Sequence, residues 1–320
     1  MKKEDLRIVF LGTPEFAVES LDTLVKNDFN IVGVVTMPDK PAGRGHKLLQ
    51  SAVKQYAVAH GLNLMQPVSL KDPEFIGTLR SLQADLFIVI AFRMLPEVVW
   101  QMPPLGTFNL HASLLPRYRG AAPINRAVMN GDTETGVTTF MLKHEIDTGD
   151  ILAQERTPIG PDECVGDVHD RLMSIGARLT LKTVNDILAG DLRPVPQDEL
   201  LQGAEPTPAP KIFKDDCHID WNRPAAEVHN LVRGLSPYPA AWAMMSLAGA
   251  PAVSVKITKV TPLDGVGVTT PGHVTIDGDR LIVDCADKPV VIETLQPAGK
   301  RSMQAADLLR GLNPRTVTCE

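Results

Sequence analysis

The stretch Leu86-Phe87-Ile88-Val89-Ile90-Ala91 is apolar throughout, as expected of a central parallel strand in a sheet that helices cover on both faces. A second apolar run at residues 7–12 ends at a glycine, and apolar side chains recur at helical spacing over 16–24 and 73–82. Strands that alternate with helical stretches form βαβ units. The sequence therefore predicts an α/β domain with a doubly wound, mostly parallel sheet.

The composition changes after Gly190. Five prolines fall in the short polar stretch that follows, without apolar periodicity, which is typical of a semi-extended linker. Short β-rich runs then recur about every ten residues, as in a small barrel or sandwich. These runs cover residues 252–260, 272–276, 280–285 and 290–295. The predicted organisation is an α/β domain over 1–190, a proline-rich linker over 191–210 and a small β domain over 211–320.

Composition excludes several classes of protein. The 320 residues include 32 basic and 38 acidic side chains, a net charge of -6, which argues against non-specific coating of nucleic acid but permits a local basic patch. No apolar run reaches the roughly 18 residues of a membrane span, and the charged N-terminus lacks the apolar segment of a signal peptide. The four cysteines show no CxxC pair and no zinc spacing. We expect a cytoplasmic protein with no metal site and no membrane partner.

Two polar residues stand out in the segment 106–116. Asn109 and His111 are two residues apart, so a strand would place both side chains on the same face. An amide donor beside an imidazole can stabilise a developing oxyanion and transfer a proton. On spacing alone, however, a core pair that satisfies nearby backbone groups is favoured by about two to one.

A third candidate is Asp147, in the sequence Asp147-Thr148-Gly149-Asp150. These residues form turns readily, and spacing alone favours a turn former by about three to one. The alternative is a carboxylate that orients His111 or accepts a proton.

The segment 36–47 combines prolines and glycines with the cations Lys40, Arg44 and Lys47. We expect an irregular loop here, since this composition is unsuited to regular secondary structure. A basic loop that follows the carboxyl end of a strand can reach a phosphate-bearing substrate. A solvated surface loop explains the composition equally well.

Several motifs occur together in one order along the chain. They are Val9–Phe16, the Gly43-Arg44-Gly45 loop, Asn109–Pro116, Asp147–Asp150, Ile219-Asp220-Trp221 and Arg233–Pro239. With them, the sequence resembles the methionyl-tRNA formyltransferase family nearly from end to end. The Asn-x-His, Ser-Leu-Leu-Pro and Asp-Thr-Gly motifs mark the wider 10-formyltetrahydrofolate transferase superfamily. The Gly-Arg-Gly loop and the C-terminal motifs narrow the resemblance to the tRNA enzymes, and together they outweigh the simpler interpretations.

The resemblance implies a Rossmann-like formyltransferase domain, a linker and an OB-like tRNA-binding barrel. It implies transfer of a formyl group from 10-formyltetrahydrofolate to the α-amino group of methionine on initiator tRNA, without a metal ion. Asn109, His111 and Asp147 would be the catalytic residues. The partners would be initiator methionyl-tRNA and the folate cosubstrate, and we expect a monomer.

Binding residues are implied as well. The folate-site signature would consist of Ser113, Leu114, Leu115 and Pro116. Arg44, with Lys40 and Lys47 beside it, would meet the aminoacyl end of the tRNA. At Arg93 the sequence departs from the family, which usually has an aromatic-glycine step lining the pterin pocket, so the pocket wall is expected to differ here.

Two alternatives stay open. A formyltransferase that acts on a sugar nucleotide or on glycinamide ribonucleotide would share the first domain, but the Gly43-Arg44-Gly45 loop and Trp221 count against it. A tRNA- or folate-binding protein without turnover would not need the three catalytic residues.

An acidic protein must bind RNA through a few placed cations. Those expected in the C-terminal part are Lys211, Lys214, Lys300 and Arg301.

Overall fold

The computed structural model describes residues 2–42, 47–201, 205–265 and 269–319. The chain forms two compact units, and each contains more than one stretch of the sequence. The first unit consists of Met1–Gly120, Gly136–Thr157 and His169–Pro208. The second consists of Ala121–Thr135, Pro158–Val168 and Ala209–Glu320.

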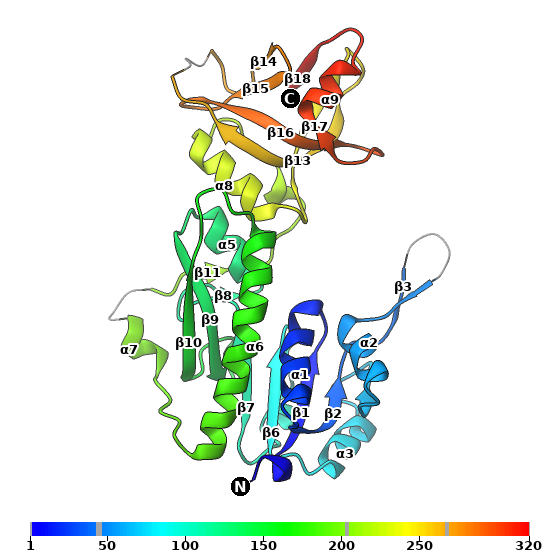
Figure 1. The fold of residues 1–320 in the computed structure, drawn as a ribbon, viewed down its shortest axis with the longest axis vertical. Helices are drawn as coiled ribbons and strands as arrows, with labels where there is room; N and C mark the ends of the chain where they lie inside the picture. The colour runs from blue at the N-terminus through cyan, green and yellow to red at the C-terminus, as the bar shows by residue number, and fades with distance from the viewer. Residues whose placement is uncertain (1, 43–46, 202–204, 266–268, 320) are drawn as a thin grey trace. The chain divides into compact units, whose positions relative to one another are not determined.

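The first unit is built on a seven-stranded sheet with the order β10-β9-β7-β6-β1-β2-β5 (Figure 1). β1 (Arg7–Gly12) lies between β2 (Asn30–Val35) and β6 (Leu86–Ile90), and all of these pairings are parallel. β6 and β2 pair in parallel with β7 (Thr107–His111) and β5 (Leu64–Met65). β9 (Glu134–Met141) is antiparallel to β7 and precedes β10 (Ile151–Pro158). The structure thus confirms the predicted mostly parallel, Rossmann-like α/β sheet.

Helices cover both faces of this sheet. Val9 and Leu11 of β1 pack with side chains from α3 (Pro73–Ser81) and α4 (Glu97–Trp100) on one face. Ile8 and Phe10 are also fully buried, so the opposite face of β1 is covered too. Figure 1 shows α1 (Glu15–Lys26) and α6 (Val165–Ala189) together in front of the sheet. Every residue of β6 is buried, which confirms the interpretation of the opening apolar run as a central strand.

Local sequence signals explain where the helices begin. The carboxylate of Asp72 accepts a hydrogen bond from the backbone N–H of Glu74 at 3.0 Å, and Pro73 occupies the first helical position of α3. Ser51 caps α2 (Ala52–Ala59) in the same way, through the N–H of Lys54 at 3.0 Å. The remaining short elements of this region are η1 (Lys3–Asp5), β8 (Arg119–Gly120), α7 (Gln197–Leu201) and β11 (Pro208–Ala209).

The basic segment is more regular than the sequence predicted. The strands β3 (Lys40–Ala42) and β4 (Lys47–Leu49) pair as an antiparallel ribbon, with Pro41 opposite Leu48. The expectation of an irregular loop was therefore wrong for these residues. A two-stranded ribbon has only edge strands, and an edge strand tolerates a proline because its missing N–H costs no interior ladder bond.

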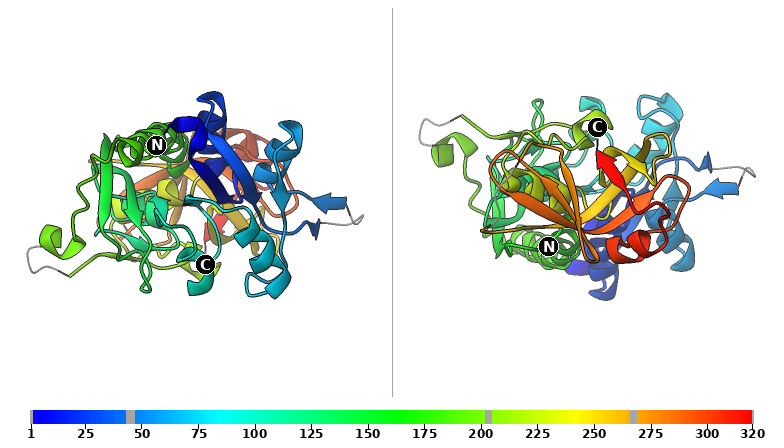
Figure 2. Two further views of the ribbon diagram at one scale, coloured as in Figure 1. Left: turned by 90° about the horizontal axis from the view of Figure 1, so that it is seen from below. Right: turned by 90° about the horizontal axis from the view of Figure 1, so that it is seen from above.

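The second unit contains an antiparallel sheet with the order β14-β15-β16-β13-β12-β18. The edge strands β14 (Val274–Asp277) and β18 (Val317–Cys319) contact each other, so the sheet forms the nearly closed barrel that Figure 2 shows from above. This confirms the expected barrel. The other strands and helices are β12 (Ala241–Leu247), β13 (Val253–Pro262), β15 (Arg280–Asp284), β16 (Pro289–Pro297), β17 (Met303–Gln304), α9 (Ala305–Arg310), α5 (Pro123–Met129), η2 (Asp215–Cys217) and α8 (Ala225–Leu235).

Helix α8 joins the separate stretches of the second unit. Its apolar face contributes Val228, Val232 and Leu235 to the barrel core. On its other side, the amide of Asn125 donates to the carbonyl of Gly234 at 2.8 Å. Arg233 is 7% exposed and donates to the carbonyls of Gly160 and Glu163 at 3.2 and 3.1 Å. These bonds explain why residues 121–135 and 158–168 belong to the C-terminal unit.

Candidate functional site

The carboxyl-terminal half of β7 carries Asn109 and His111. Phe108 and Leu110 are buried in the sheet on either side of Asn109, and strand alternation gives the two polar residues a common face. Asn109 is half-buried, and its Oδ1 is buried without a hydrogen-bond partner in the part of the chain that the structure describes. Such an acceptor is costly in a fold and suggests a partner that is bound only during function.

His111 is 7% exposed and is held in one orientation by the backbone. Its Nε2 lies 2.8 Å from the carbonyl oxygen of Tyr118. A carbonyl can only accept, so Nε2 must carry the hydrogen, and Nδ1 is the nitrogen that can gain or lose a proton. Nδ1 lies 3.8 Å from Oδ2 of Asp147. The Phe140 ring packs edge-on against the imidazole, with centroids 6.4 Å apart.

Asp147 is both a turn residue and a neighbour of the imidazole. Its backbone φ is 56°, in the left-handed region that turn residues adopt. Its Oδ2 accepts a hydrogen bond from the backbone N–H of Gly120 at 2.9 Å, whereas the 3.8 Å to His111 exceeds hydrogen-bond distance. The two groups are therefore neighbours in this structure without a hydrogen bond between them. No side-chain pattern could have identified the backbone groups of Tyr118 and Gly120 as the partners of these residues.

The segment Ser113–Pro116 follows β7 and is fastened to the neighbouring strands. The hydroxyl of Thr138 on β9 donates to the carbonyl of Ser113 at 2.6 Å and accepts from the N–H of Leu115 at 3.1 Å. Gln154 on β10 donates to the carbonyl of Leu115 at 2.7 Å. Leu114 packs so closely on Gly136 that an added Cβ would lie 2.5 Å from it. These contacts hold the segment in place directly after β7, the strand that carries Asn109 and His111.

Arg93 follows β6 and binds backbone rather than another side chain. Its guanidinium donates to the carbonyls of Val68, at 2.9 Å, and Pro67, and it lies over the Phe92 ring at 5.7 Å. Its Nε is buried without a hydrogen-bond partner among the described residues. Arg93, the residue at which the sequence departs from the family, therefore links the loop after β6 to the loop after β5 at the carboxyl edge of the sheet.

The base of the β3–β4 ribbon is anchored at Asp39. Lys54 contacts one carboxylate oxygen at 2.6 Å, and the amide of Gln66 donates to the other at 2.9 Å. The hydrogen bond from Lys54 lowers the pKa of the Asp39 carboxyl. Of the three predicted cations, Lys40 is exposed and Lys47 begins β4, whereas Arg44 lies outside the described residues.

The four C-terminal cations are exposed on the second unit. Lys211 lies over the ring of Phe213, with its Nζ 5.4 Å from the centroid, and Phe213 is itself 62% exposed. Lys214 lies in the same way over Trp242 at 5.5 Å. The exposed ring of Phe213 beside Lys211 is typical of surfaces that bind nucleic acid, whereas Trp242 is half-buried and donates from Nε1 to the Lys214 carbonyl at 2.9 Å. Lys300 and Arg301 follow β16.

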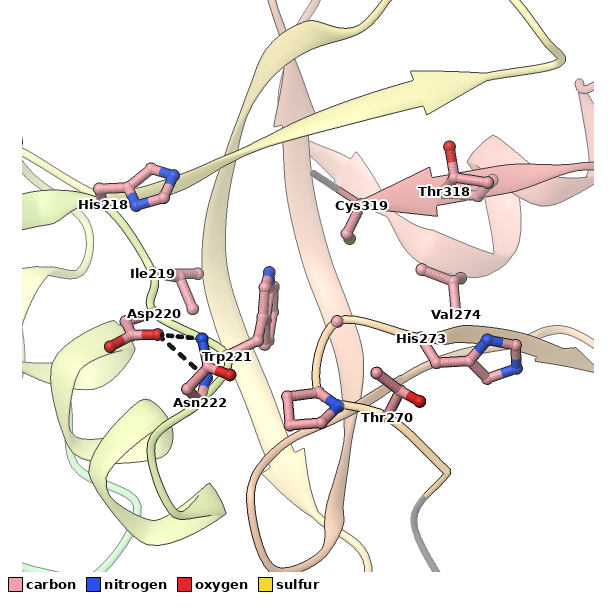
Figure 3. Close-up of a pocket in the computed structure, with 13 residues that line it drawn as sticks. His218, Ile219, Asp220, Trp221, Asn222, Thr270, His273, Val274, Thr318 and Cys319 are labelled. Carbon is pink, nitrogen blue, oxygen red and sulfur yellow. Dashed lines mark hydrogen bonds between the residues drawn. The ribbon is translucent and has the colours of Figure 1, made fainter.

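Figure 3 shows a pocket of about 590 Å³ in the second unit. Residues from 218–222, 270–274 and 317–319 line it, and none of the four C-terminal cations is among them. Trp221 lies in its centre with an Nε1 that has no hydrogen-bond partner within the described ranges. The Asp220 carboxylate accepts from the backbone N–H and the amide of Asn222 at 3.0 and 2.9 Å. The lining contains none of the candidate catalytic residues.

The described residues contain neither a metal-binding cluster nor a membrane-spanning helix. No group of three or more His, Cys, Asp or Glu side chains is arranged there to hold a metal ion. No helix in the described ranges is long and apolar enough to cross a membrane.

Comparisons with known proteins cover nearly the whole chain. The formyl transferase family model matches residues 6–184, and the model of the formyl transferase C-terminal domain matches residues 211–313. A protein of Bacteroides fragilis named methionyl-tRNA formyltransferase is 57% identical over 98% of this chain and 97% of its own length. Proteins of the same name from Bacteroides thetaiotaomicron and Porphyromonas gingivalis are 55% and 49% identical, each over 97% of both chains.

Solved structures share the fold. HypX from Aquifex aeolicus in complex with tetrahydrofolic acid superposes with a TM-score of 0.64 at 19% identity, over 96% of this chain and 48% of that one. An N-formyltransferase from Helicobacter canadensis, in complex with folinic acid and dTDP-3-aminofucose, superposes with a TM-score of 0.65 at 20% identity, over 91% of this chain and 99% of that one.

Proposed function

Since the chain belongs to the formyl transferase family, we infer that it transfers a formyl group from 10-formyltetrahydrofolate to methionyl-tRNA. The observation that carries this function is the 57% identity, over 98% of the chain, to a methionyl-tRNA formyltransferase. Both family models match, one on each side of the proline-rich stretch. The preference for initiator tRNA and the roles of individual residues are further parts of the proposal.

We assign to Asn109 the stabilisation of the oxyanion that forms during formyl transfer. When the α-amine of methionine attacks the formyl carbon, negative charge develops on the formyl oxygen, and a positioned donor stabilises it. Among the described residues Oδ1 of Asn109 has no hydrogen-bond partner, and this free acceptor supports the role. Its Nδ2 can donate to the oxyanion while Oδ1 accepts from the attacking amine.

His111 is assigned to proton transfer, with Asp147 as its charge partner. The Nε2–H is committed to Tyr118, so Nδ1 takes the proton that the amine loses as the new C–N bond forms. The same proton passes from His111 to N10 of the folate as the bond between N10 and the formyl carbon breaks. The products are the formylated amine and tetrahydrofolate, and His111 is neutral again. The carboxylate of Asp147, 3.8 Å away, stabilises the imidazolium between these steps.

The two substrates are assigned to different parts of the chain. The segment Ser113, Leu114, Leu115 and Pro116 forms one wall for the folate, because it is fixed beside Asn109 and His111. The cations Lys40, Arg44 and Lys47 of the segment 36–47 meet the aminoacyl end of the tRNA. The pairing of Lys211 and Lys214 with aromatic rings supports phosphate and base contacts on the second unit, with Lys300 and Arg301 as further contacts.

The proposed functional bounds are a catalytic domain over 1–190, a linker over 191–210 and a tRNA-binding domain over 211–320. We place the enzyme in the cytoplasm, where charged tRNA is used.

A competition assay tests the function against its alternatives. Purified protein is given 10-formyltetrahydrofolate together with equal concentrations of initiator methionyl-tRNA and a nucleotide-linked amino sugar. Formylation of the tRNA is expected. Formylation of the sugar instead would establish the sugar-nucleotide alternative, and binding of tRNA or folate without any product would establish the binding protein.

A further inference from the structure

A side chain within the predicted linker donates both of its amide hydrogens to the turn that carries Asp147. Gln197 begins α7 and is 2% exposed. Its Nε2 donates to the carbonyls of Asp147, at 2.9 Å, and Gly149, at 2.8 Å. Its Oε1 accepts from Nε and Nη2 of Arg119 at 3.0 and 2.8 Å. A glutamine amide has two donor hydrogens and two acceptor lone pairs, so all of its capacity is directed at this contact.

The turn that Gln197 holds has little freedom of its own. Asp147 has a left-handed φ of 56°, a turn conformation that aspartate tolerates better than most residues with a side chain. Gly149 lies so close to Met141 that an added Cβ would be 1.5 Å from the carbonyl oxygen. Gln197 binds the carbonyls of the same turn, and this fixes the peptide planes that set the direction of the Asp147 side chain toward His111.

A second contact from the predicted linker reaches His111. The carbonyl of Thr207 accepts a hydrogen bond from the N–H of Tyr118 at 2.6 Å, and the carbonyl of Tyr118 accepts from His111 at 2.8 Å. Val195 is also paired with Ile151, N–H to carbonyl in both directions at 2.9 and 2.8 Å. Residues on both sides of Gln197 are therefore tied to the unit that contains the candidate catalytic groups.

We propose that Gln197 is a positioning residue for Asp147, and that the stretch predicted as a linker thereby takes part in building the catalytic site. The inference rests on the proposed function, in which Asp147 stabilises protonated His111. Gln197 touches no reacting atom in this scheme. It acts by holding the Asp147 turn, and Arg119 in turn fixes which end of the Gln197 amide faces the turn.

The test compares two Gln197 variants with a control on the same helix. Gln197→Leu keeps approximate size and removes every hydrogen bond, whereas Gln197→Glu keeps the acceptor for Arg119 and removes the donor to the turn. Glu199→Gln, an exposed neighbour, is the control. Formyl transfer to methionyl-tRNA is measured for each variant, and thermal unfolding confirms that each is folded.

Both Gln197 variants should lower kcat by about 10- to 100-fold, because a displaced catalytic group loses its reactive geometry. The KM values for both substrates should stay within about threefold of wild type, since binding contacts are intact. Glu199→Gln should match wild type. In an Asp147→Asn background, Gln197→Leu should add less than about threefold, because residues that act as one unit are not additive.

Three results would overturn the proposal. They are unchanged kcat in the folded Gln197 variants, a loss confined to KM, or a loss that multiplies in full on the Asp147→Asn background, as a general structural defect would. Wild-type protein without turnover on methionyl-tRNA would instead refute the proposed function, and this inference with it. Normal wild-type turnover with normal Gln197 variants refutes this inference alone.

Discussion

Replacement of Asn109 by alanine should lower kcat and leave the free energy of unfolding almost unchanged. The amide that stabilises the oxyanion is lost, so kcat should fall by about 10²–10³, equivalent to roughly 2.7–4 kcal/mol of transition-state stabilisation. The fold should lose little, because Oδ1 of Asn109 has no hydrogen-bond partner among the described residues. An unpaired buried acceptor costs about 1–3 kcal/mol, and its removal offsets the lost packing. The free energy of unfolding should therefore stay within about 1 kcal/mol of wild type.

His111→Ala provides the contrast. It removes the buried hydrogen bond to the Tyr118 carbonyl, which the structure shows at 2.8 Å, and such a bond contributes about 0.5–1.5 kcal/mol. This variant should lose both kcat and stability. Single-turnover formyl transfer at saturating methionyl-tRNA and urea unfolding measure the two quantities for each variant. An Asn109→Ala protein that loses more than about 2 kcal/mol of stability, yet keeps kcat within threefold, would make Asn109 a structural residue.

Four other outcomes are expected. Asp147→Asn should lower kcat, because an amide cannot stabilise an imidazolium; an unchanged kcat would leave Asp147 as a turn residue only. Lys300→Ala should weaken tRNA binding and reduce the slope of log K against log[salt] by about one, and an unaltered slope would remove it from the interface. Arg44→Leu should slow single-turnover transfer at saturating tRNA as well as weaken binding, since a misplaced amine loses its attack geometry; if neither changes, Arg44 does not meet the aminoacyl end. Asp39→Asn should lower the free energy of unfolding at pH 7. Lys54 lowers the pKa of Asp39 below its ordinary value of 3.8 in the folded protein, so this stabilisation is complete above pH 3.8 and is lost as pH falls through the folded pKa. Urea unfolding between pH 7 and pH 3 should show the wild-type advantage shrinking, and a constant difference would contradict the assignment.

The α/β unit could be predicted from sequence because its signals are local. The apolar run of β6, the Asp72 cap of α3 and the alternation around Asn109 each depend on a few neighbouring residues. Four barrel strands, β13 to β16, were predicted from β-rich runs in the same way. β12 was not predicted, because its sequence is rich in alanine and methionine, which favour helices. Its inward residues Ala241, Ala243 and Met245 are fully buried, so barrel packing overrides their propensity.

The parts of the site that were missed depend on contacts between distant residues. Asp147 and His111 were both singled out, but the 3.8 Å between them and the bond from His111 to Tyr118 are properties of the folded chain. Gln197 follows two prolines in a polar stretch without periodicity, so it was predicted only as part of a linker. Its partners are backbone carbonyls, which no side-chain pattern marks. The β3–β4 ribbon was missed because the prolines and glycines of the segment 36–47 favoured an irregular loop over the pairing of two edge strands.

The central claim is that the formyl group moves from the folate to the α-amine of tRNA-bound methionine. The most direct test uses 10-formyltetrahydrofolate labelled in the formyl carbon with initiator methionyl-tRNA, and with the same tRNA carrying N-acetylmethionine. The label should appear as N-formylmethionine on the free-amine substrate only, at a rate that Asn109→Ala lowers by about 10²–10³. No labelled methionine with the free-amine substrate, or equal labelling of the blocked one, would contradict the account.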